Sequence, residues 1–105
     1  MSDGNHISPW FPETDQVTLA ILGKVAEEAA ELSARASRCI IQGLSKPDPD
    51  SLRPNSDELV REMSDVLAAI DNVRVNLDLW QDTRRVERKF SGYQRWLDLI
   101  KAGRA

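Results

Sequence analysis

The chain has 105 residues, of which 41% are hydrophobic and 30% are charged, and its formal net charge is −3. This length supports one domain, and the composition is typical of a globular protein and excludes an intrinsically disordered one. The charge is unevenly distributed, because seven basic and two acidic residues follow position 83 and give that segment +5, which leaves −8 on the first 83 residues. Non-specific nucleic-acid binding normally needs a basic balance overall, so the charge disfavours that class.

The cysteine content and the hydropathy favour the cytoplasm. Cys39 is the single cysteine, so no intrachain disulfide can form, as is typical of proteins in reducing compartments. No apolar run approaches the roughly 20 residues needed to span a membrane. The first residues also lack the charged and apolar regions of a signal peptide. We therefore expect a soluble cytoplasmic protein that has no membrane partner.

Two parts of unequal length are predicted. Residues 1–13 contain Gly4, Pro9 and Pro12 around two aromatic side chains, and we interpret them as an N-terminal arm without regular structure. Residues 14–105 show helical periodicity for most of their length and are expected to form one helical domain.

The first predicted helix covers about residues 15–42. Thr14 or Asp15 can cap its start, no proline interrupts it, and Gly43 supplies the expected stop. Its apolar residues recur in steps of three and four, which is the spacing of one helix face. The positions expected on that face are Leu22, Val25, Ala29, Leu32, Ala36 and Cys39.

A second helix is predicted after a proline-containing loop at residues 43–54. Asn55 and Glu58 resemble a capping box, in which the two side chains satisfy backbone groups of the first turn. The apolar residues then alternate in steps of four and three, a spacing that packs antiparallel neighbours in helical bundles. These residues are Leu59, Met63, Val66, Ile70, Val73 and Leu77.

The last part of the chain is predicted to hold a third helix and a short fourth one. Asn76 can adopt the left-handed conformation that ends a helix. Asp78 can then cap the third helix, with Gln81 reaching back to it. Gly92 is expected to break or bend that helix, leaving a short C-terminal helix at residues 93–101.

The predicted fold class is therefore all-α. We expect an antiparallel bundle of three main helices plus the short C-terminal helix, since no strand-like alternation is present. Three long amphipathic helices in so short a chain leave apolar surface that one copy covers poorly. Association of subunits into a four-helix or larger bundle is therefore expected.

Four acidic residues form two pairs on the first two helices. Glu28 with Glu31, and Glu62 with Asp65, are each three residues apart and so are neighbours on one helix face. If the apolar seams of the two helices face each other, all four carboxylates lie along the edge of the seam. Such a cluster repels itself unless protons or cations compensate it, and its oxygen ligands suit Mg²⁺. The alternative is two solvated acidic faces that bind nothing.

These residues carry a resemblance to a known family. The pattern Glu27-Glu28-x-x-Glu31, a loop, and then Glu62-x-x-Asp65 resembles the signature of MazG-like all-α nucleoside triphosphate pyrophosphohydrolases. The similar region runs from about residue 19 to residue 89. It includes the phrase Glu-Met-Ser-Asp-Val-Leu, where such enzymes typically have Glu-Leu-Gly-Asp-Val-Leu.

The resemblance implies an α-helical dimer or tetramer that hydrolyses the bond between the α- and β-phosphates of nucleoside triphosphates. It also implies that Mg²⁺, or Mn²⁺ in its place, is held by Glu28, Glu31, Glu62 and Asp65. Glu27 would orient or deprotonate the attacking water or bind a further ion. Lys89 falls where such enzymes carry a lysine near the phosphates.

Two further residues are candidates for contact with the substrate. Lys24 lies one turn before Glu28 and can reach a phosphate or form an ion pair within its helix. Asn72 lies seven residues after Asp65 on the same helix face. Alternative functions are phosphoribosyl-ATP pyrophosphohydrolase activity, which uses a similar fold and motif, and a non-catalytic helical interaction module.

Overall fold

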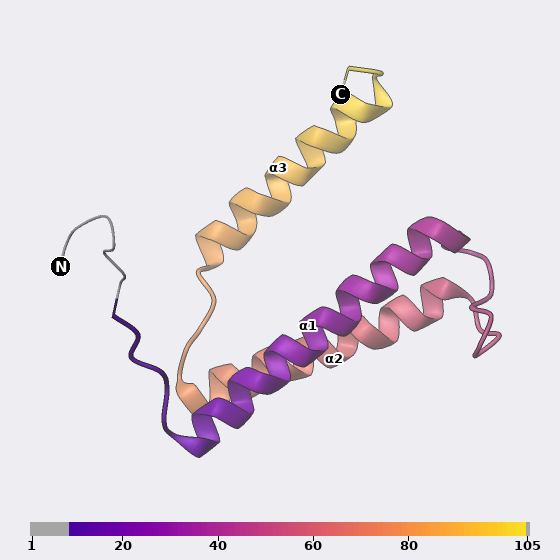
Figure 1. Ribbon diagram of the computed structural model, residues 1–105. Helices are drawn as coiled ribbons and strands as arrows, with labels where there is room; N and C mark the ends of the chain where they lie inside the picture. The colour runs from indigo at the N-terminus through magenta and orange to yellow at the C-terminus, as the bar shows by residue number, and fades with distance from the viewer. Residues whose placement is uncertain (1–8, 105) are drawn as a thin grey trace, which may run out of the picture.

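The computed structural model describes residues 9–104, which form three helices and no strand: α1 (Gln16–Gln42), α2 (Asn55–Leu77) and α3 (Thr83–Lys101) (Figure 1). The all-α prediction is confirmed. Residues 1–8 of the predicted arm lie outside the described residues, whereas residues 9–15 are described and are not helical. None of the three described helices combines the length and the apolar character needed to cross a bilayer.

Both ends of α1 are set by the predicted residues. The Asp15 side chain accepts a hydrogen bond of 2.9 Å from the Thr18 backbone N–H, and this bond lowers the pKa of the Asp15 carboxyl. At the other end, Gly43 has a φ of 99° and donates its backbone N–H to the Cys39 carbonyl. A side chain at this φ would be strained, so glycine suits the position.

The predicted capping box at the start of α2 is wrong. Asn55 is the first helical residue rather than the cap, and its neighbour Pro54 occupies the cap position without a side-chain hydrogen bond. The Asn55 amide instead donates to the Gly43 carbonyl at 3.1 Å, and it accepts a hydrogen bond from Arg35. The side chain therefore joins the two helix ends across the loop.

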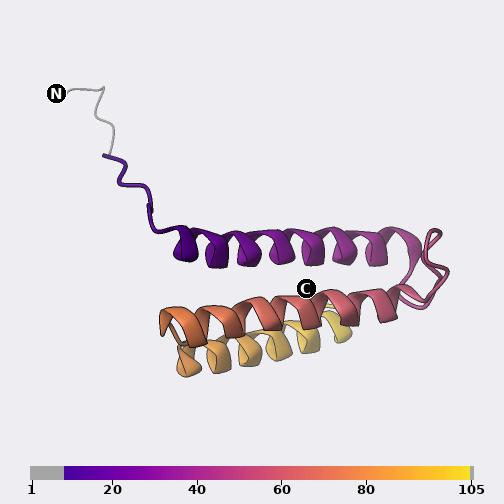
Figure 2. The same cartoon turned by 90° about the horizontal axis from the view of Figure 1, so that it is seen from below.

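Helices α1 and α2 form an antiparallel hairpin, and the two views in Figures 1 and 2 show them side by side along most of their length. The positions in the seam differ from the prediction. The buried or half-buried residues of α1 keep a regular three-four spacing but include polar side chains. They are Thr18, Ile21, Val25, Glu28, Leu32, Arg35, Cys39 and Gln42.

The expected seam residues Leu22, Ala29 and Ala36 of α1 and Met63 of α2 are exposed instead. Both helices carry apolar residues on more than one side, so the period alone does not determine which side faces the partner helix. Consequently two of the four acids, Glu28 and Glu62, lie within the seam rather than at its edge.

The end of α2 and the start of α3 also differ from the prediction. Asp78, rather than Asn76, adopts the left-handed conformation after α2, with a φ of 53°. The next helix starts later than expected, with Asp82 as its cap and a hydrogen bond from the Arg85 backbone N–H to the Asp82 side chain. Gly92 does not break this helix. The expected short C-terminal helix is thus the second half of α3.

Helix α3 packs on neither α1 nor α2 within residues 9–104 (Figures 1 and 2). The three predicted main helices are present, and within one copy they form a two-helix hairpin and a separate third helix. The radius of gyration is 19.0 Å, against about 13 Å for a compact chain of this length. Among the described residues, Ile21 and Ala69 are the buried hydrophobic ones. Most of the apolar surface of one copy is consequently exposed.

Candidate metal centre

The two predicted carboxylate pairs meet across the hairpin. Glu28 and Glu31 come from the middle of α1, and Glu62 and Asp65 come from the facing part of α2. One carboxylate oxygen from each of the four residues lies within 4.8 Å of those of the other three. The antiparallel pairing brings these residues together because each pair occupies one turn of its helix.

The cluster is electrostatically unfavourable without a counterion. Glu28 and Glu62 are half-buried, whereas Glu31 and Asp65 are exposed. A side-chain hydrogen bond with Glu31, which requires one proton between the two carboxyls, raises the pKa of Glu28. Burial and the negative charges of Glu31, Asp65 and Glu27 raise the pKa of Glu28 further.

One atom of the cluster is buried without a partner. Oε2 of Glu62 is shielded from solvent and accepts no hydrogen bond from any of the described residues. An unpaired carboxylate oxygen in such a place is costly unless something positive binds it. The four carboxylates of this cluster together fit a hard divalent cation such as Mg²⁺ or Mn²⁺.

A cleft of about 280 Å³ opens beside the cluster, and its lining contains two of the predicted substrate-binding residues. Lys24 and Asn72 line it together with Glu28 and Asp65. Ala68 and Ala69 complete the lining, and their small side chains leave space in front of the carboxylates. The structure thus places a cation, an amide and two acids around one opening.

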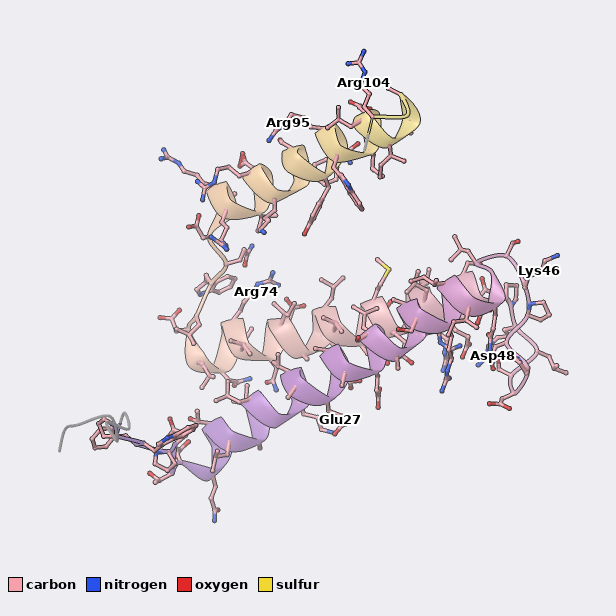
Figure 3. All side chains as sticks on the ribbon, turned by 45° about the horizontal axis from the view of Figure 1, so that its top comes forward. Glu27, Lys46, Asp48, Arg74, Arg95 and Arg104 are labelled. Atoms are coloured by element: carbon pink, nitrogen blue, oxygen red, sulfur yellow. The ribbon has the colours of Figure 1, made fainter. Side chains whose placement is uncertain are left out.

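Two other predicted residues lie outside this cleft. Glu27 is exposed midway along α1 (Figure 3), where Nζ of Lys24 lies 3.3 Å from its Oε1. The ion pair expected for Lys24 is therefore formed, with Glu27 rather than Glu28. Lys89 lies on α3, among the residues that line two other clefts, and the structure of one copy does not bring it to the carboxylates.

A buried polar network near the connecting loop was not predicted. Nη1 of Arg35 donates to Oδ1 of Asp48 at 2.9 Å and to Oδ1 of Asn55 at 3.3 Å. Nη2 of Arg35 lies 3.6 Å from Oε2 of Glu58, and Nε of Arg53 donates to Oε1 of Glu58 at 2.7 Å. The network ties α1, the loop and the first turn of α2 together. Asp48 is labelled in the loop in Figure 3.

One signal in the sequence could have revealed this network. Arg35 follows Leu32 by three residues and precedes Cys39 by four, so it occupies a position of the seam. A charged residue at a seam position requires partners. The loop that follows offers Asp48 and Asn55 as those partners.

Comparisons of the chain with protein-family models, with curated proteins and with solved structures found no match. The interpretation of the site therefore depends on its own geometry. That geometry joins Glu28, Glu31, Glu62 and Asp65, and places Lys24 and Asn72 at the adjoining cleft.

Proposed function

We propose that this chain is a Mg²⁺-dependent nucleoside triphosphate pyrophosphohydrolase of the MazG-like type. The observation that supports it most is the convergence of four carboxylates, in which one oxygen of each lies within 4.8 Å of those of the others. Glu62, a member of this cluster, also carries a buried oxygen without a partner. The reaction adds water across the bond between the α- and β-phosphates and releases a nucleoside monophosphate and pyrophosphate. Its expected role is removal of unwanted nucleotides in the cytoplasm.

In this proposal Glu28, Glu31, Glu62 and Asp65 hold the metal. A bound Mg²⁺ or Mn²⁺ ion would neutralise phosphate charge and lower the pKa of a coordinated water. The protein residues around it position the substrate and exclude competing geometries, which is the main contribution of the protein in phosphoryl chemistry.

The residues at the cleft have separate roles. Lys24 would place its positive charge next to a phosphate of the substrate. Its exposed ion pair with Glu27 is weak, so Lys24 can leave Glu27 to contact a polyanion. Glu27 lies outside the cleft but next to Lys24, and once Lys24 turns to the substrate its carboxylate can accept a proton from the attacking water. Asn72 offers an amide that can donate to the ligand, although its Oδ1 accepts a hydrogen bond of 2.6 Å from Asn76 in the absence of ligand.

A homo-oligomer, expected to be a dimer or tetramer, is part of the proposal. Helix α3 carries a row of exposed apolar side chains beside a groove of about 440 Å³ that Val86, Phe90 and Tyr93 help to line. The hairpin exposes Leu22, Met63 and further apolar residues that its own seam does not use. Exposed apolar surface of this extent in a folded chain indicates an interaction surface. In such an assembly Lys89 remains a candidate contact to phosphate.

The oligomer can be tested by light scattering coupled to size exclusion. Phe90, which is 61% exposed in one copy, should be buried in the assembly. We expect Phe90→Ser to lower the mass to that of one chain, whereas Leu52→Gly in the loop should leave the mass unchanged. A wild-type protein that is monomeric at high concentration would contradict this part of the proposal.

The activity can be tested by measuring pyrophosphate release from a panel of canonical and modified ribo- and deoxyribonucleoside triphosphates, with Mg²⁺, with Mn²⁺ and with EDTA. We expect metal-dependent release with monophosphate as the co-product. Activity on phosphoribosyl-ATP alone would replace the proposed substrate class. If no substrate releases pyrophosphate with either metal, and neither metal changes the melting temperature, a non-catalytic interaction module is favoured.

A further inference from the structure

Arg35 is a buried cation close to the acidic cluster that the proposed chemistry does not use. The residue is 8% exposed, and its guanidinium contacts the side chains of Asp48, Asn55 and Glu58. Its partners come from the loop and from α2, whereas Arg35 itself belongs to α1. The side chain therefore fastens the two helices of the hairpin to each other at the loop end.

The position of this contact along the hairpin links it to the acidic cluster. Arg35 follows Glu31 by four residues on α1, and Glu58 precedes Glu62 by four residues on α2. One helical turn, about 6 Å along the axis for four residues, separates the two levels on each helix. The contact between Arg35 and Glu58 thus crosses the seam one turn nearer to the loop than Glu31 and Glu62 do.

The cluster needs a contact that holds the two helices together, because its carboxylates repel each other across the seam before a metal ion binds. Apolar burial at the loop end is only partial, since Ile21 and Ala69 are the buried hydrophobic residues among the described ones, and neither lies there. Two buried atoms of opposite charge also lack hydrogen bonds within residues 9–104, namely Nε of Arg35 and Oε2 of Glu62. The negative charge of Glu62 contributes to raising the pKa of Arg35, after the larger effect of Asp48.

We infer that Arg35 is a positioning residue for the metal site, which holds α1 against α2 so that Glu31 and Glu62 are assembled before the ion arrives. This inference rests on the proposed function, because it assigns a role at that metal site. A site assembled in advance spends less of its binding energy on ordering its ligands. Loss of a group that hydrogen-bonds a metal ligand typically lowers metal affinity by about 10–100-fold, and the lower end of this range is expected for Arg35, which acts on the ligands through the helices.

The geometry explains why the residue is arginine. The planar guanidinium contacts three side-chain acceptors in fixed directions, of which two share Nη1 and the third faces Nη2. A lysine ammonium carries the same charge on a flexible stem but does not reproduce this planar fork. Arg35→Lys keeps the charge and Arg35→Met removes it, so comparing the two variants separates the effect of the charge from that of the planar fork.

The experiment measures the dissociation constant of Mn²⁺ by calorimetry on the full chain without nucleotide, for the wild type, Arg35→Met, Arg35→Lys and Arg53→Met. We expect both Arg35 variants to bind Mn²⁺ at least about tenfold more weakly. Arg53→Met is the matched control, because Arg53 contacts the same Glu58 but is half exposed and lies in the loop. Its Mn²⁺ affinity should remain within about twofold of wild type.

Several outcomes would overturn the inference. Unchanged Mn²⁺ affinity in Arg35→Met with a wild-type helical circular dichroism spectrum would show that the contact is structural alone. Full recovery of affinity in Arg35→Lys would show that charge without positioning suffices. If Arg35→Met does not fold, Asp48→Asn gives the milder test, and it should weaken Mn²⁺ binding in the same direction. Unchanged affinity in that variant would also overturn the inference.

The same measurement separates this inference from the proposed function. A wild-type protein that binds Mn²⁺ but hydrolyses no nucleotide would overturn the proposed activity and leave the positioning role standing if Arg35→Met binds Mn²⁺ more weakly. A wild-type protein that hydrolyses nucleotides, with Mn²⁺ affinity unaffected by Arg35→Met, would overturn the positioning role alone. A wild-type protein that binds no Mn²⁺ would overturn both.

Discussion

Two groups of acidic residues lie about one helical turn apart on the same hairpin and differ in how their charge is balanced. At the loop end, Asp48 and Glu58 face Arg35 and Arg53. In the middle, Glu28, Glu31, Glu62 and Asp65 face one another, and Lys24 pairs with Glu27 beside them. The first group is compensated within the chain, and the second group is not.

The pKa values of the two groups shift in opposite directions for this reason. The backbone hydrogen bond from Ser51 and then the hydrogen bond from Arg35 hold the pKa of Asp48 at about 2. The hydrogen bond from Arg53 lowers the pKa of Glu58, whereas the neighbouring carboxylates raise the pKa of Glu28. Similar acidic residues on the same helices are thus compensated by arginine and backbone donors at the loop end, and left mutually repelling in the middle of the hairpin.

The largest expected effect comes from removing one charge of the uncompensated group. Glu62→Gln or Asp65→Asn should lower turnover by about 10²-fold or more, the loss typical of removing one group that stabilises charge in the transition state. The melting temperature without metal should stay the same or rise, because a repulsion is removed. Mg²⁺ should raise the melting temperature of the wild type but not of the variants.

The matched control for this prediction is Asp57→Asn. Asp57 is an exposed carboxylate in the first turn of α2 and has no part in the cluster. Its substitution should leave turnover and the response to Mg²⁺ within about twofold of wild type. Loss of helical structure in the Glu62 or Asp65 variants would mean that the uncompensated group is structural, and the contrast between the two groups would fail.

A smaller effect is expected from the compensated group. Asn55 is fully buried and bonds both Arg35 and the Gly43 carbonyl, so Asn55→Ala leaves buried polar atoms unpaired. The free energy of unfolding should fall by about 2 kcal/mol or more, which urea titration followed by circular dichroism can measure. Asn76→Ala, at an exposed position of the same helix, should change it by less than about 0.5 kcal/mol.

The low pKa of Asp48 in the compensated group also predicts that the stability of the fold decreases at acid pH. The pKa of Asp48 lies at about 2 in the folded chain and at 3.8 ordinarily, so its stabilising effect is complete above about pH 4 and is lost as the pH falls towards 2. Asp48→Asn should therefore flatten the wild-type decline of the urea midpoint over this range. Parallel pH profiles of the two proteins would show that Asp48 is not a source of the acid sensitivity.

The smallest expected effect concerns the backbone of the loop that carries Asp48. Leu52 has a φ of 65° and is 75% exposed, so it adopts a left-handed conformation without burying its side chain. Leu52→Gly should raise the free energy of unfolding by up to about 1 kcal/mol, because glycine adopts this conformation without strain. Leu44→Gly, in the same loop but without a positive φ, should lower it instead.

The sequence predicted the presence of the three helices and both ends of α1, because these signals are local. The three-four spacing, the cap at Asp15 and the stop at Gly43 each depend on a few neighbouring residues, and the structure confirms them. The four clustered carboxylates could also be predicted, since the two pairs occupy matching turns of consecutive helices. The assignment of Lys89 to a phosphate remains a prediction, because no contact of α3 with the hairpin tests it.

The features that the sequence did not reveal depend on contacts between distant residues. Which apolar side of α1 faces α2 is decided by both helices together. The period of α1 alone therefore predicts Ala29 and Ala36 in a seam that Glu28 and Arg35 occupy. Asn55 had the local features of a cap, but a buried arginine 20 residues earlier offered it a different partner. Capping rules consider only neighbouring residues, so they do not include a distant hydrogen-bond partner such as Arg35.

The positions of the tryptophans determine what optical spectroscopy can follow in this protein. Trp10, Trp80 and Trp96 are the three tryptophans of the chain, and all three lie outside the α1–α2 hairpin on exposed parts of the chain. The Trp80 indole donates to the Asp78 side chain where the chain leaves α2, and Trp96 lies on α3. In the proposed oligomer, indole emission of Trp80 and Trp96 would therefore report on burial of the α3 region between copies, whereas unfolding of the hairpin will be visible mainly in far-ultraviolet dichroism. Assembly and folding can thus be recorded independently in the unmodified protein.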